Sequence, residues 1–474
     1  MKKIVLLVIS VLLVGFSAFS QDKAREDSIL AANPNRIYGY NDVIRPEEFQ
    51  APSKAPKGYE PFYIAHYGRH GSRFAWNSRT YTWIDEVLTA QKEKGNLTEL
   101  GLELQKDYKV FAQICTPQTG DLTRKGWNQH NAIAKHMYKS YPKLFKRNPK
   151  IFAASSSSFR AMMSMSAFCV GLKECDPKLD LYEQMSSLYF DECIPESGSN
   201  PNKLGPQDRL PRKCAGQTGA YTDSLVDVDA IARRIFKDPE AALGTQKSSF
   251  IYELNMAYIG LNSLDFEVKL PEVFTFEEFK GFYLSDCVYF YNSMSDALDY
   301  GALIKRLVIL ADEALAQDRP SVNLRFGHDY ILDRYLSLAG INNFGKEIPS
   351  IDYAYVYYPV REVPMGCNIQ FVFYKSKKSP DVLVKVVLNG KEGTLPVIYK
   401  VISYIPKRQG IGSRAPAPSS VLHRNAGRAQ VKIERFLIRI PSEYLLIKDH
   451  VRVELARNIV SRIRHAHYLT FGRL

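Results

Sequence analysis

The sequence lacks several features that mark other classes of protein. None of its seven cysteines form a C-x-x-C pair, which leaves little support for a structural zinc site or a thioredoxin-like site. After the first 20 residues no apolar run is long enough to span a membrane. There is also no internal repeat or low-complexity block. With 474 residues, of which 45% are apolar, the chain can bury a sizeable core. We expect two to three domains, or one large α/β domain with an insertion.

The N-terminus has the three-part layout of a secretory signal peptide. Lys2 and Lys3 precede an apolar run over residues 4–16, and small residues precede Gln21. The apolar run is shorter than the roughly 20 residues that a membrane span needs. We therefore predict cleavage after Ser20, a periplasmic or secreted protein, and no stable membrane span after cleavage.

Export makes disulfides expected for some of the cysteines, although an odd number leaves at least one thiol free or paired with another molecule. Two pairs are close enough in sequence to be candidates, Cys169 with Cys175 and Cys193 with Cys214. Spacing does not define the connectivity, and the oligomeric state is equally open.

The formal net charge of +13 is concentrated at one end of the chain. Residues 398–474 hold 15 Lys and Arg against 4 Asp and Glu, which leaves only +2 for the first 397 residues. Residues 176–300 are acidic, with 21 acidic and 11 basic side chains. A nucleic-acid-binding groove needs basic residues across its whole surface, so we expect no nucleic-acid partner.

Apolar patterning divides the chain into five segments. After the signal peptide, 21–57 is polar and contains proline, so we predict an exposed N-terminal arm. Residues 58–175 and 301–397 alternate strand and helix patterns and form the predicted α/β core, with a mostly parallel sheet flanked by helices. The acidic, aromatic segment 176–300 is predicted to be an inserted, largely helical cap. The basic tail, 398–474, resembles no other part of the chain.

Several elements of this core follow from periodicity. Buried strands are predicted over 63–66, 150–155 and 321–326, and two late strands at the sheet edge over 369–375 and 382–388. Helices are predicted over 80–91, 99–113, 127–145, 161–172 and 302–316. A Leu-Thr-x-x-Gly pattern at 97–101 and again at 122–126 is expected to start a helix each time.

Each of the first three strands is followed by a polar cluster. Segment 63–73 reads Tyr-Ile-Ala-His-Tyr-Gly-Arg-His-Gly-Ser-Arg, so that Arg69, His70 and Arg73 follow the first strand. Arg160 follows the second, after a run of serines, and His328-Asp329 the third. Ligands of open α/β sheets collect at the carboxyl ends of strands. Arginine forks bind phosphate oxygens in pairs, and a neutral imidazole can attack phosphorus. Each cluster alone also has a simple structural explanation. Arg160 could be a surface charge, and the triplet Gly327-His328-Asp329 could cap a helix.

Together these motifs resemble the two signatures of the histidine acid phosphatase branch of the histidine phosphatase superfamily, which includes phytases and multiple inositol polyphosphate phosphatases. The resemblance covers about 59–396, excluding the insertion, and includes Leu122 to Gly126, Ser155 to Arg160 and Asn368 to Gln370. It implies a phosphoglycerate mutase-like core and a phosphorylated small-molecule substrate, and among such substrates it favours an inositol polyphosphate such as phytate.

The resemblance also implies a role for each site residue. His70 would be the nucleophile and form a phosphohistidine, and Asp329 would protonate the leaving alcohol and then activate water. Four side chains would hold the phosphoryl oxygens, namely Arg69, Arg73, Arg160 and His328. No metal or other cofactor is implied, because the arginines supply the positive charge.

Two departures from the family pattern concern the loop and the donor. Ala75 stands where members often have proline. His328-Asp329-Tyr330 replaces the His-Ala-Glu of many inositol polyphosphate phosphatases, which leaves the subgroup and the substrate open. A loop cluster of Arg209, Arg212 and Lys213 is a candidate for binding further phosphates, or is a solvated loop.

Other classes fit the residues less well. His66-x-x-x-His70 has metal-ligand spacing only on a helix, and this stretch is a predicted strand and turn. The serines lack a G-x-S-x-G elbow. A mutase is disfavoured because Arg73 follows the Arg-His-Gly motif, at a place where mutase-like members of the superfamily tend to have Glu or another residue. A non-catalytic phosphate-binding surface protein would need neither His70 nor Asp329. A broad acid phosphatase acting on sugar phosphates or nucleotides remains the main alternative.

The tail from Ile398 is the least explained part of the sequence. Its charge changes abruptly, and the resemblance ends near Pro396. One interpretation is a basic accessory segment that binds anionic surfaces. The hypothesis we prefer is a change of reading frame, which the other two frames of the coding DNA would reveal.

Overall fold

The computed structural model describes residues 21–185, 193–194, 217–293, 301–317, 319–346, 348–395 and three short strands nearer the C-terminus. The predicted signal peptide, the cluster of Arg209, Arg212 and Lys213, and most of the basic tail lie outside the described residues. No described helix is both long and apolar enough to cross a lipid bilayer.

The fold is built on one mixed sheet with the strand order β3-β2-β4-β1-β5-β6-β7, and β9 also pairs with β6. The first four strands are mutually parallel, and β5, β6, β7 and β9 are antiparallel to their neighbours. The strands are β1 (Tyr59–Arg69), β2 (Lys150–Ser155), β3 (Asp180–Gln184), β4 (Ser321–Gly327), β5 (Asn368–Ser376), β6 (Val382–Leu388), β7 (Lys391–Glu392) and β9 (Leu445–Ile447). A separate pair is formed by β8 (Ile402–Ser403) and β10 (Val451–Arg452).

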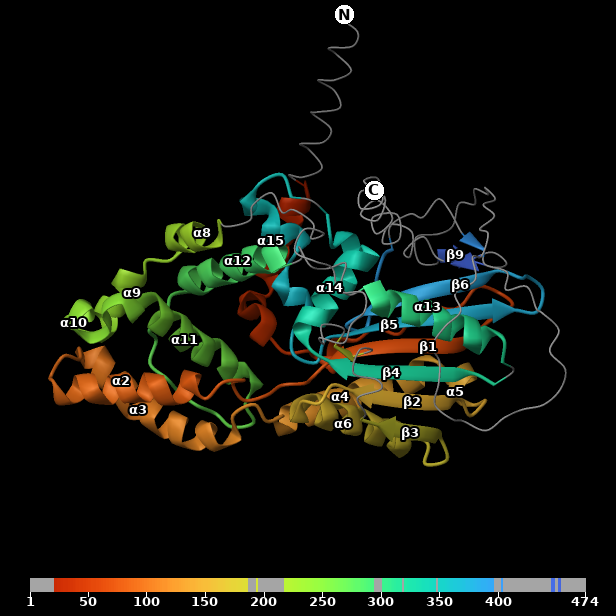
Figure 1. Cartoon of the computed structure of the whole chain (residues 1–474), viewed down its shortest axis with the longest axis horizontal. Coiled ribbons are helices and arrows are strands. Elements are labelled where there is room, and N and C mark those ends of the chain that lie inside the picture. Colours follow the sequence, from red (N-terminus) through yellow and green to blue (C-terminus); the bar gives the residue numbers. More distant parts are fainter. Residues whose placement is uncertain are drawn as a thin grey trace, which may run out of the picture.

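Helices cover both faces of this sheet, which gives the α/β architecture that the sequence predicts (Figure 1). Along β1, Tyr63 and Tyr67 face the helices α13 and α14, whereas Ile64 packs on the other face against α4, α5 and α6. This alternation is the period of two that a strand buried on both faces requires. The helices are α4 (Arg124–Ser140), α5 (Pro142–Phe145), α6 (Phe159–Cys175), α13 (Gly301–Leu315) and α14 (Asp329–Ala339).

A helical region lies beside the carboxyl ends of the parallel strands, at the left of Figure 1. Its hydrophobic core combines side chains of 217–293 with side chains from α2 and α3, so two separate stretches of the chain build it. The helices are α2 (Arg79–Glu93), α3 (Glu99–Cys115), α8 (Thr218–Leu225), α9 (Val228–Ile235), α10 (Pro239–Leu243), α11 (Lys247–Gly260) and α12 (Phe276–Ser293).

Both Leu-Thr-x-x-Gly patterns start a helix, as predicted. Thr98 caps α3 by accepting a hydrogen bond from the Gly101 N–H at 3.0 Å, and Thr123 caps α4 in the same way through Gly126 at 3.2 Å. A threonine at the N-cap accepts the otherwise unpaired N–H three residues later. The capping residue therefore fixes where each helix begins.

Three expectations from sequence differ from the structure. The N-terminal arm, 21–57, is not exposed, because Leu30, Ile37 and Ile44 are buried in the hydrophobic cores. Residues 180–184, assigned to the insertion, add β3 to the core sheet. The late strand β5 is interior, between β1 and β6. In each case the deciding contact joins residues that are far apart in sequence.

The cysteines show no bond between Cys169 and Cys175, one of the two candidate pairs. Both lie on α6, and both are free thiols, as are Cys115, Cys287 and Cys367. Cys169 and Cys175 are six residues apart on one helix, which directs their side chains away from each other. The pair Cys193 and Cys214 includes a residue outside the described part.

Candidate active site

The three polar clusters meet at one edge of the sheet because their strands are parallel neighbours. Strand β4 lies between β1 and β2, with Arg69 opposite Gly327 and Ser155 opposite Phe326. The backbone continues this pairing one residue further, since the His70 N–H donates to the Gly327 carbonyl at 3.0 Å. The Arg-His-Gly loop, the serine turn and the His-Asp pair therefore leave the sheet side by side.

His70 is buried, and its ring is held in one orientation. Its Nδ1 lies 2.9 Å from the backbone carbonyl of Gly71. Since a carbonyl oxygen only accepts hydrogen bonds, Nδ1 carries the proton and Nε2 carries the lone pair. Burial together with the charges of Arg69, Arg73 and Arg160 holds the pKa of His70 well below its usual value. The imidazole is therefore neutral and nucleophilic even in acid.

The same three arginines each present a buried N–H group. The Nε atoms of Arg69, Arg73 and Arg160 are all buried and have no hydrogen-bond partner among the described residues. Burial, followed by the repulsion from Arg69 and Arg160, lowers the pKa of Arg73 to about 9, so it stays protonated at neutral and acidic pH. Buried donors normally find a partner, so three together beside His70 form a site for an anion.

Asp329 brings a carboxylate into this positive cluster, with 27% of its side chain exposed, and forms a 2.7 Å ion pair with Arg69 Nη2. Burial opposes ionisation of this carboxyl, but the charge of Arg69, with His328 and Arg73, holds its pKa below the usual value. It occupies the first turn of α14, where the helix dipole favours a negative charge. Asp329 is therefore a carboxylate that Arg69 neutralises.

His328 completes the group and is positioned by two residues that the sequence analysis did not select. Its Nε2 lies 3.1 Å from the Ser156 Oγ, and its ring stacks on Tyr330 with 5.5 Å between centroids. The rings of His328 and His70 meet edge to face at 5.7 Å. Burial and the charge of Arg160 lower the pKa of His328 to about 4, so it is a neutral hydrogen-bonding group above that pH.

The sequence profile of the histidine phosphatase superfamily (branch 2) matches residues 68–389, a stretch that contains all six of these side chains. The chain belongs to the histidine phosphatase superfamily. Branch 2 comprises the histidine acid phosphatases, as the sequence motifs predicted. The comparison with curated proteins finds no match.

Solved structures share the fold of this histidine phosphatase at low sequence identity. The multiple inositol polyphosphate phosphatase of Bifidobacterium longum, in complex with inositol hexasulfate, aligns over 76% of this chain and 93% of its own, with a TM-score of 0.61 and 16% identity. The complex of the same enzyme with phosphate aligns over the same shares of both chains, with a TM-score of 0.58 and 15% identity. The phytase from D. castellii aligns over 76% of this chain and 79% of its own, with a TM-score of 0.54 and 17% identity.

The second Leu-Thr-x-x-Gly pattern has a role in the phosphatase site besides starting α4. Thr123 donates its N–H to the Ser72 carbonyl at 2.9 Å, and its Oγ1 contacts the same oxygen at 3.1 Å. Gly126 lies against the loop 70–73 so closely that a Cβ atom there would be 2.3 Å from the Ser72 oxygen. Helix α4 therefore supports the loop by direct backbone contact.

We expect Gly126→Ala to lower both stability and activity, because the added methyl group forces the loop 70–73 away from α4. The free energy of unfolding should fall by about 1–3 kcal/mol, the usual cost of overpacking. The value of kcat/KM for a phosphomonoester should fall by roughly tenfold or more, since small displacements of catalytic groups are costly. Thermal unfolding and steady-state kinetics measure the two effects.

Gly219→Ala is the control for this variant, because no atom lies within 4 Å of a Cβ at Gly219 on α8. Alanine favours helix over glycine, so this variant should be at least as stable as the wild type. Unchanged kinetics in Gly126→Ala would show that the loop does not depend on its contact with α4.

Sequence reasoning selected the six charged and imidazole side chains that the structure brings together, but it missed the residues that hold them. Ser164 of α6 accepts a hydrogen bond from the Gly71 N–H at 3.0 Å, and Gln129 of α4 accepts one from the Ser72 N–H at 2.9 Å. Both are ordinary polar residues on helices, and their spacing carries no signal. Ser156, which contacts His328, is the one supporting residue that the sequence indicated, through the serine run at 155–158.

The histidine spacing of His66 and His70 is explained by the strand. His66 is within β1, buried against Phe168 and Phe326 with ring centroids at 4.9 and 5.1 Å. His70 follows the end of the strand, at the anion site. The two rings therefore belong to different environments, and His66 is a core residue.

Proposed function

We propose that this histidine phosphatase is an exported phosphomonoester hydrolase that works through a phosphohistidine at His70 and acts on inositol polyphosphates. The observation that carries the proposal is the pairing of a neutral His70, whose Nδ1 is held by Gly71, with three buried Nε–H donors of Arg69, Arg73 and Arg160. This combination provides a nucleophile and an anion site in one place.

The first chemical step would use the lone pair on His70 Nε2. It forms the N–P bond while the P–O bond to the alcohol breaks, and Asp329 gives its proton to the departing alkoxide. The arginines stabilise the charge on the equatorial oxygens. In the second step the Asp329 carboxylate takes a proton from water, the water oxygen attacks phosphorus, and the N–P bond breaks to release phosphate.

Protonation of Asp329 is linked to substrate binding. Before substrate binds, Arg69 keeps this carboxyl ionised through their 2.7 Å contact. A bound phosphoryl group brings negative charge next to Asp329 and competes for Arg69, and both effects raise the pKa of the carboxyl. Hydrolysis should therefore be favoured in acid, where Asp329 is protonated in the complex and His70 is still neutral.

The preference for inositol polyphosphates rests on the solved structures that share the fold and on a cluster of basic residues in the sequence. The B. longum relative was solved with inositol hexasulfate bound, and the D. castellii relative is a phytase. The sequence also offers Arg209, Arg212 and Lys213 as candidates for binding additional phosphate groups, although they lie outside the described residues. The alternative is a broad acid phosphatase that acts on sugar phosphates or nucleotides, for which one phosphate site is sufficient.

A substrate panel tests the proposal. We expect kcat/KM on phytate to exceed that on glucose phosphates and nucleoside monophosphates by at least about tenfold, since additional phosphate contacts add binding energy beyond the reacting group. Phosphate release at acidic pH is the measurement. Equal or greater activity on simple phosphomonoesters would favour the broad acid phosphatase. An absence of hydrolysis with every substrate would leave a phosphate-binding protein.

A further inference from the structure

The N-terminal arm, defined here as residues 21–57, forms a short ladder with the segment 363–367, which we call the connector. The Met365 N–H donates to the Asp42 carbonyl, and the Ile44 N–H donates to the Met365 carbonyl, each at 2.8 Å. Val43 and Met365 pair as a parallel bridge. The arm is therefore bonded through its backbone to one side of the connector.

The other side of the connector is bonded to residues 69–73, which we call the catalytic loop because it carries the proposed nucleophile His70. The Arg69 N–H donates to the Cys367 carbonyl at 2.8 Å, and the Gly366 N–H donates to the His70 carbonyl at 2.9 Å. The connector thus lies between the arm and the two residues that begin the catalytic motif. A shift of the arm would be transmitted to Arg69 and His70 through two sets of backbone hydrogen bonds.

The arm also contacts the Arg69 side chain directly. Arg69 Nη1 donates to the carbonyls of Tyr40, on the arm, and Val363, on the connector, both at 2.7 Å. These bonds use both hydrogens of Nη1, and the guanidinium is fully buried. The arm and the connector therefore fix the plane of the Arg69 guanidinium. The same plane places Nη2 in contact with Asp329.

A second route links the arm to the loop through α4. Gln129 accepts a hydrogen bond from the Ser72 N–H at 2.9 Å through Oε1 and donates from Nε2 to the Ile44 carbonyl at 3.2 Å. A single buried side chain thus joins the arm to the catalytic loop. Replacing either end of the amide would break one of the two bonds.

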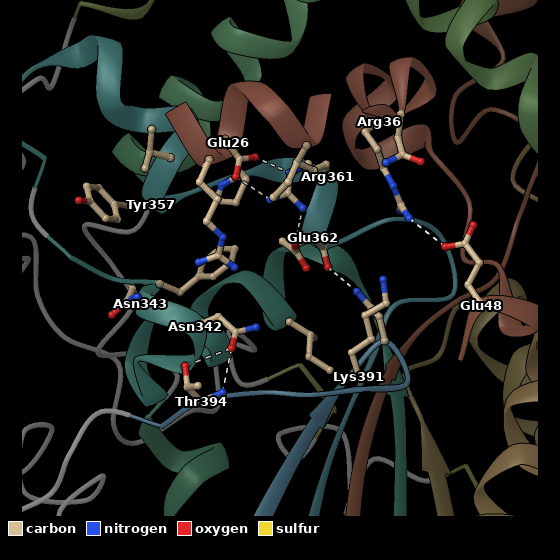
Figure 2. Close-up of a pocket in the computed structure, with 18 of the residues that line it drawn as sticks. Glu26, Arg36, Glu48, Asn342, Asn343, Tyr357, Arg361, Glu362, Lys391 and Thr394 are labelled. Carbon is tan, nitrogen blue, oxygen red and sulfur yellow. Dashed lines mark hydrogen bonds and ion pairs between the residues drawn. The ribbon is translucent and has the colours of Figure 1, made fainter. Parts of the chain in front are cut away.

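Two features hold the arm against the connector region. Gly39, with a φ of +52°, lies so close to Val360 that a Cβ would be 2.8 Å from its Cγ2. Glu26 and Arg361 form a buried ion pair, in which both carboxylate oxygens are bonded and Nη2 to Oε2 is 2.7 Å. Figure 2 shows the two side chains pointing toward each other, Glu26 from the arm and Arg361 from the short helix η11 (Val360–Glu362).

We propose that the N-terminal arm is a positioning element of the active site, with Glu26 and Gln129 as the positioning residues that keep Arg69 and the loop 70–73 in place. The inference rests on the proposed phosphatase function for its kinetic readout. It assigns to the arm a role in catalysis that its backbone contacts with Arg69 and with the connector carry.

The test compares Glu26→Gln and Gln129→Met with the wild type. Glu26→Gln keeps the shape of the side chain but removes its charge, and Gln129→Met keeps the volume but removes both hydrogen bonds. We expect kcat/KM on a phosphomonoester to fall by roughly threefold to tenfold in each. In Glu26→Gln, Arg69 should hold the Asp329 carboxylate less firmly, so the fall in activity with rising pH should occur at higher pH than in the wild type.

Glu278→Gln is the matched control, because Arg234 and Glu278 form a comparable two-bond pair, at 2.7 and 2.8 Å, in the helical region. It should lower the melting temperature by a similar amount and leave both kcat/KM and the pH profile at wild-type values. A merely structural role of Glu26 would lower the melting temperature without moving the pH profile. An unchanged pH profile in Glu26→Gln, together with unchanged kcat/KM in both Glu26→Gln and Gln129→Met, would overturn the proposal.

Binding of inorganic phosphate separates this inference from the proposed function. It requires the arginines in place but no turnover, so calorimetric titration of phosphate should show weaker binding in Glu26→Gln and Gln129→Met even if the wild type hydrolyses none of the substrates. Wild-type phosphate affinity in both variants would count against the arm independently of any catalytic result.

Discussion

Replacement of His70 by alanine is expected to abolish hydrolysis, with kcat lower by on the order of 10³-fold or more, as for the loss of other covalent nucleophiles. The reason is that Nε2 of the buried ring is the only proposed bond-forming atom. The arginines and their buried Nε–H groups remain in the variant. Binding of inorganic phosphate should therefore persist, within about tenfold of wild type. Phosphate release and calorimetric titration measure the two properties.

His136→Ala is a suitable control for His70→Ala, because His136 is a partly buried histidine of α4 that packs on Phe49, away from the anion site. Hydrolysis at the wild-type rate in His70→Ala, with the fold intact by circular dichroism, would exclude a phosphohistidine at this residue. Loss of hydrolysis with retained phosphate binding would also exclude the non-catalytic binder, since a binder has no turnover to lose.

Replacement of Asp329 by asparagine is expected to slow hydrolysis by about 10²–10⁴-fold for a substrate with a poor leaving group, such as phytate. An activated aryl phosphate needs little protonation of its leaving group, so its first step should be much less affected. The wild-type rate should decrease as pH rises through the pKa of Asp329 in the complex, because the acid form is lost. Asparagine does not ionise, so this dependence should disappear in the variant.

The comparison of phytate with an aryl phosphate, each over a range of pH, measures these effects. Asp85→Asn on α2 serves as the control, since it makes the same chemical change in the helical region. An equal loss of activity on both substrates, relative to wild type, would argue against Asp329 as the proton donor. Removal of the carboxylate also frees Arg69 Nη2, so phosphate binding should be retained or tighter.

Export and the identity of the tail remain predictions that other experiments decide. Mass spectrometry of the mature N-terminus would locate a cleavage after Ser20. In the tail, β9 pairs with β6 at the edge of the sheet, and the family profile ends at residue 389, close to where the motif resemblance ends. The coding DNA in the other two frames tests the change of reading frame.

The sequence by itself determined most of the local elements and the family, and it pointed to a site for phosphate. The apolar run before Arg69 gave β1, and the threonines of the Leu-Thr-x-x-Gly patterns fixed the starts of α3 and α4, because capping uses atoms only three residues apart. The positions of charged and imidazole residues after strand ends predicted a shared site, because parallel strands end at the same edge of a sheet.

Only the tertiary structure decided how that site is held. The contacts of Arg69 with Tyr40 and Val363, of Ser72 with Gln129, and of His328 with Ser156 join residues from 29 to 294 positions apart. The acceptors for Arg69 are backbone carbonyls, which every residue has, so no pattern of side chains marks them. The sequence predicted an exposed arm because backbone contacts leave no pattern in the side chains. The composition of the arm is polar, but its backbone is bonded to the connector, and only the folded chain shows that contact.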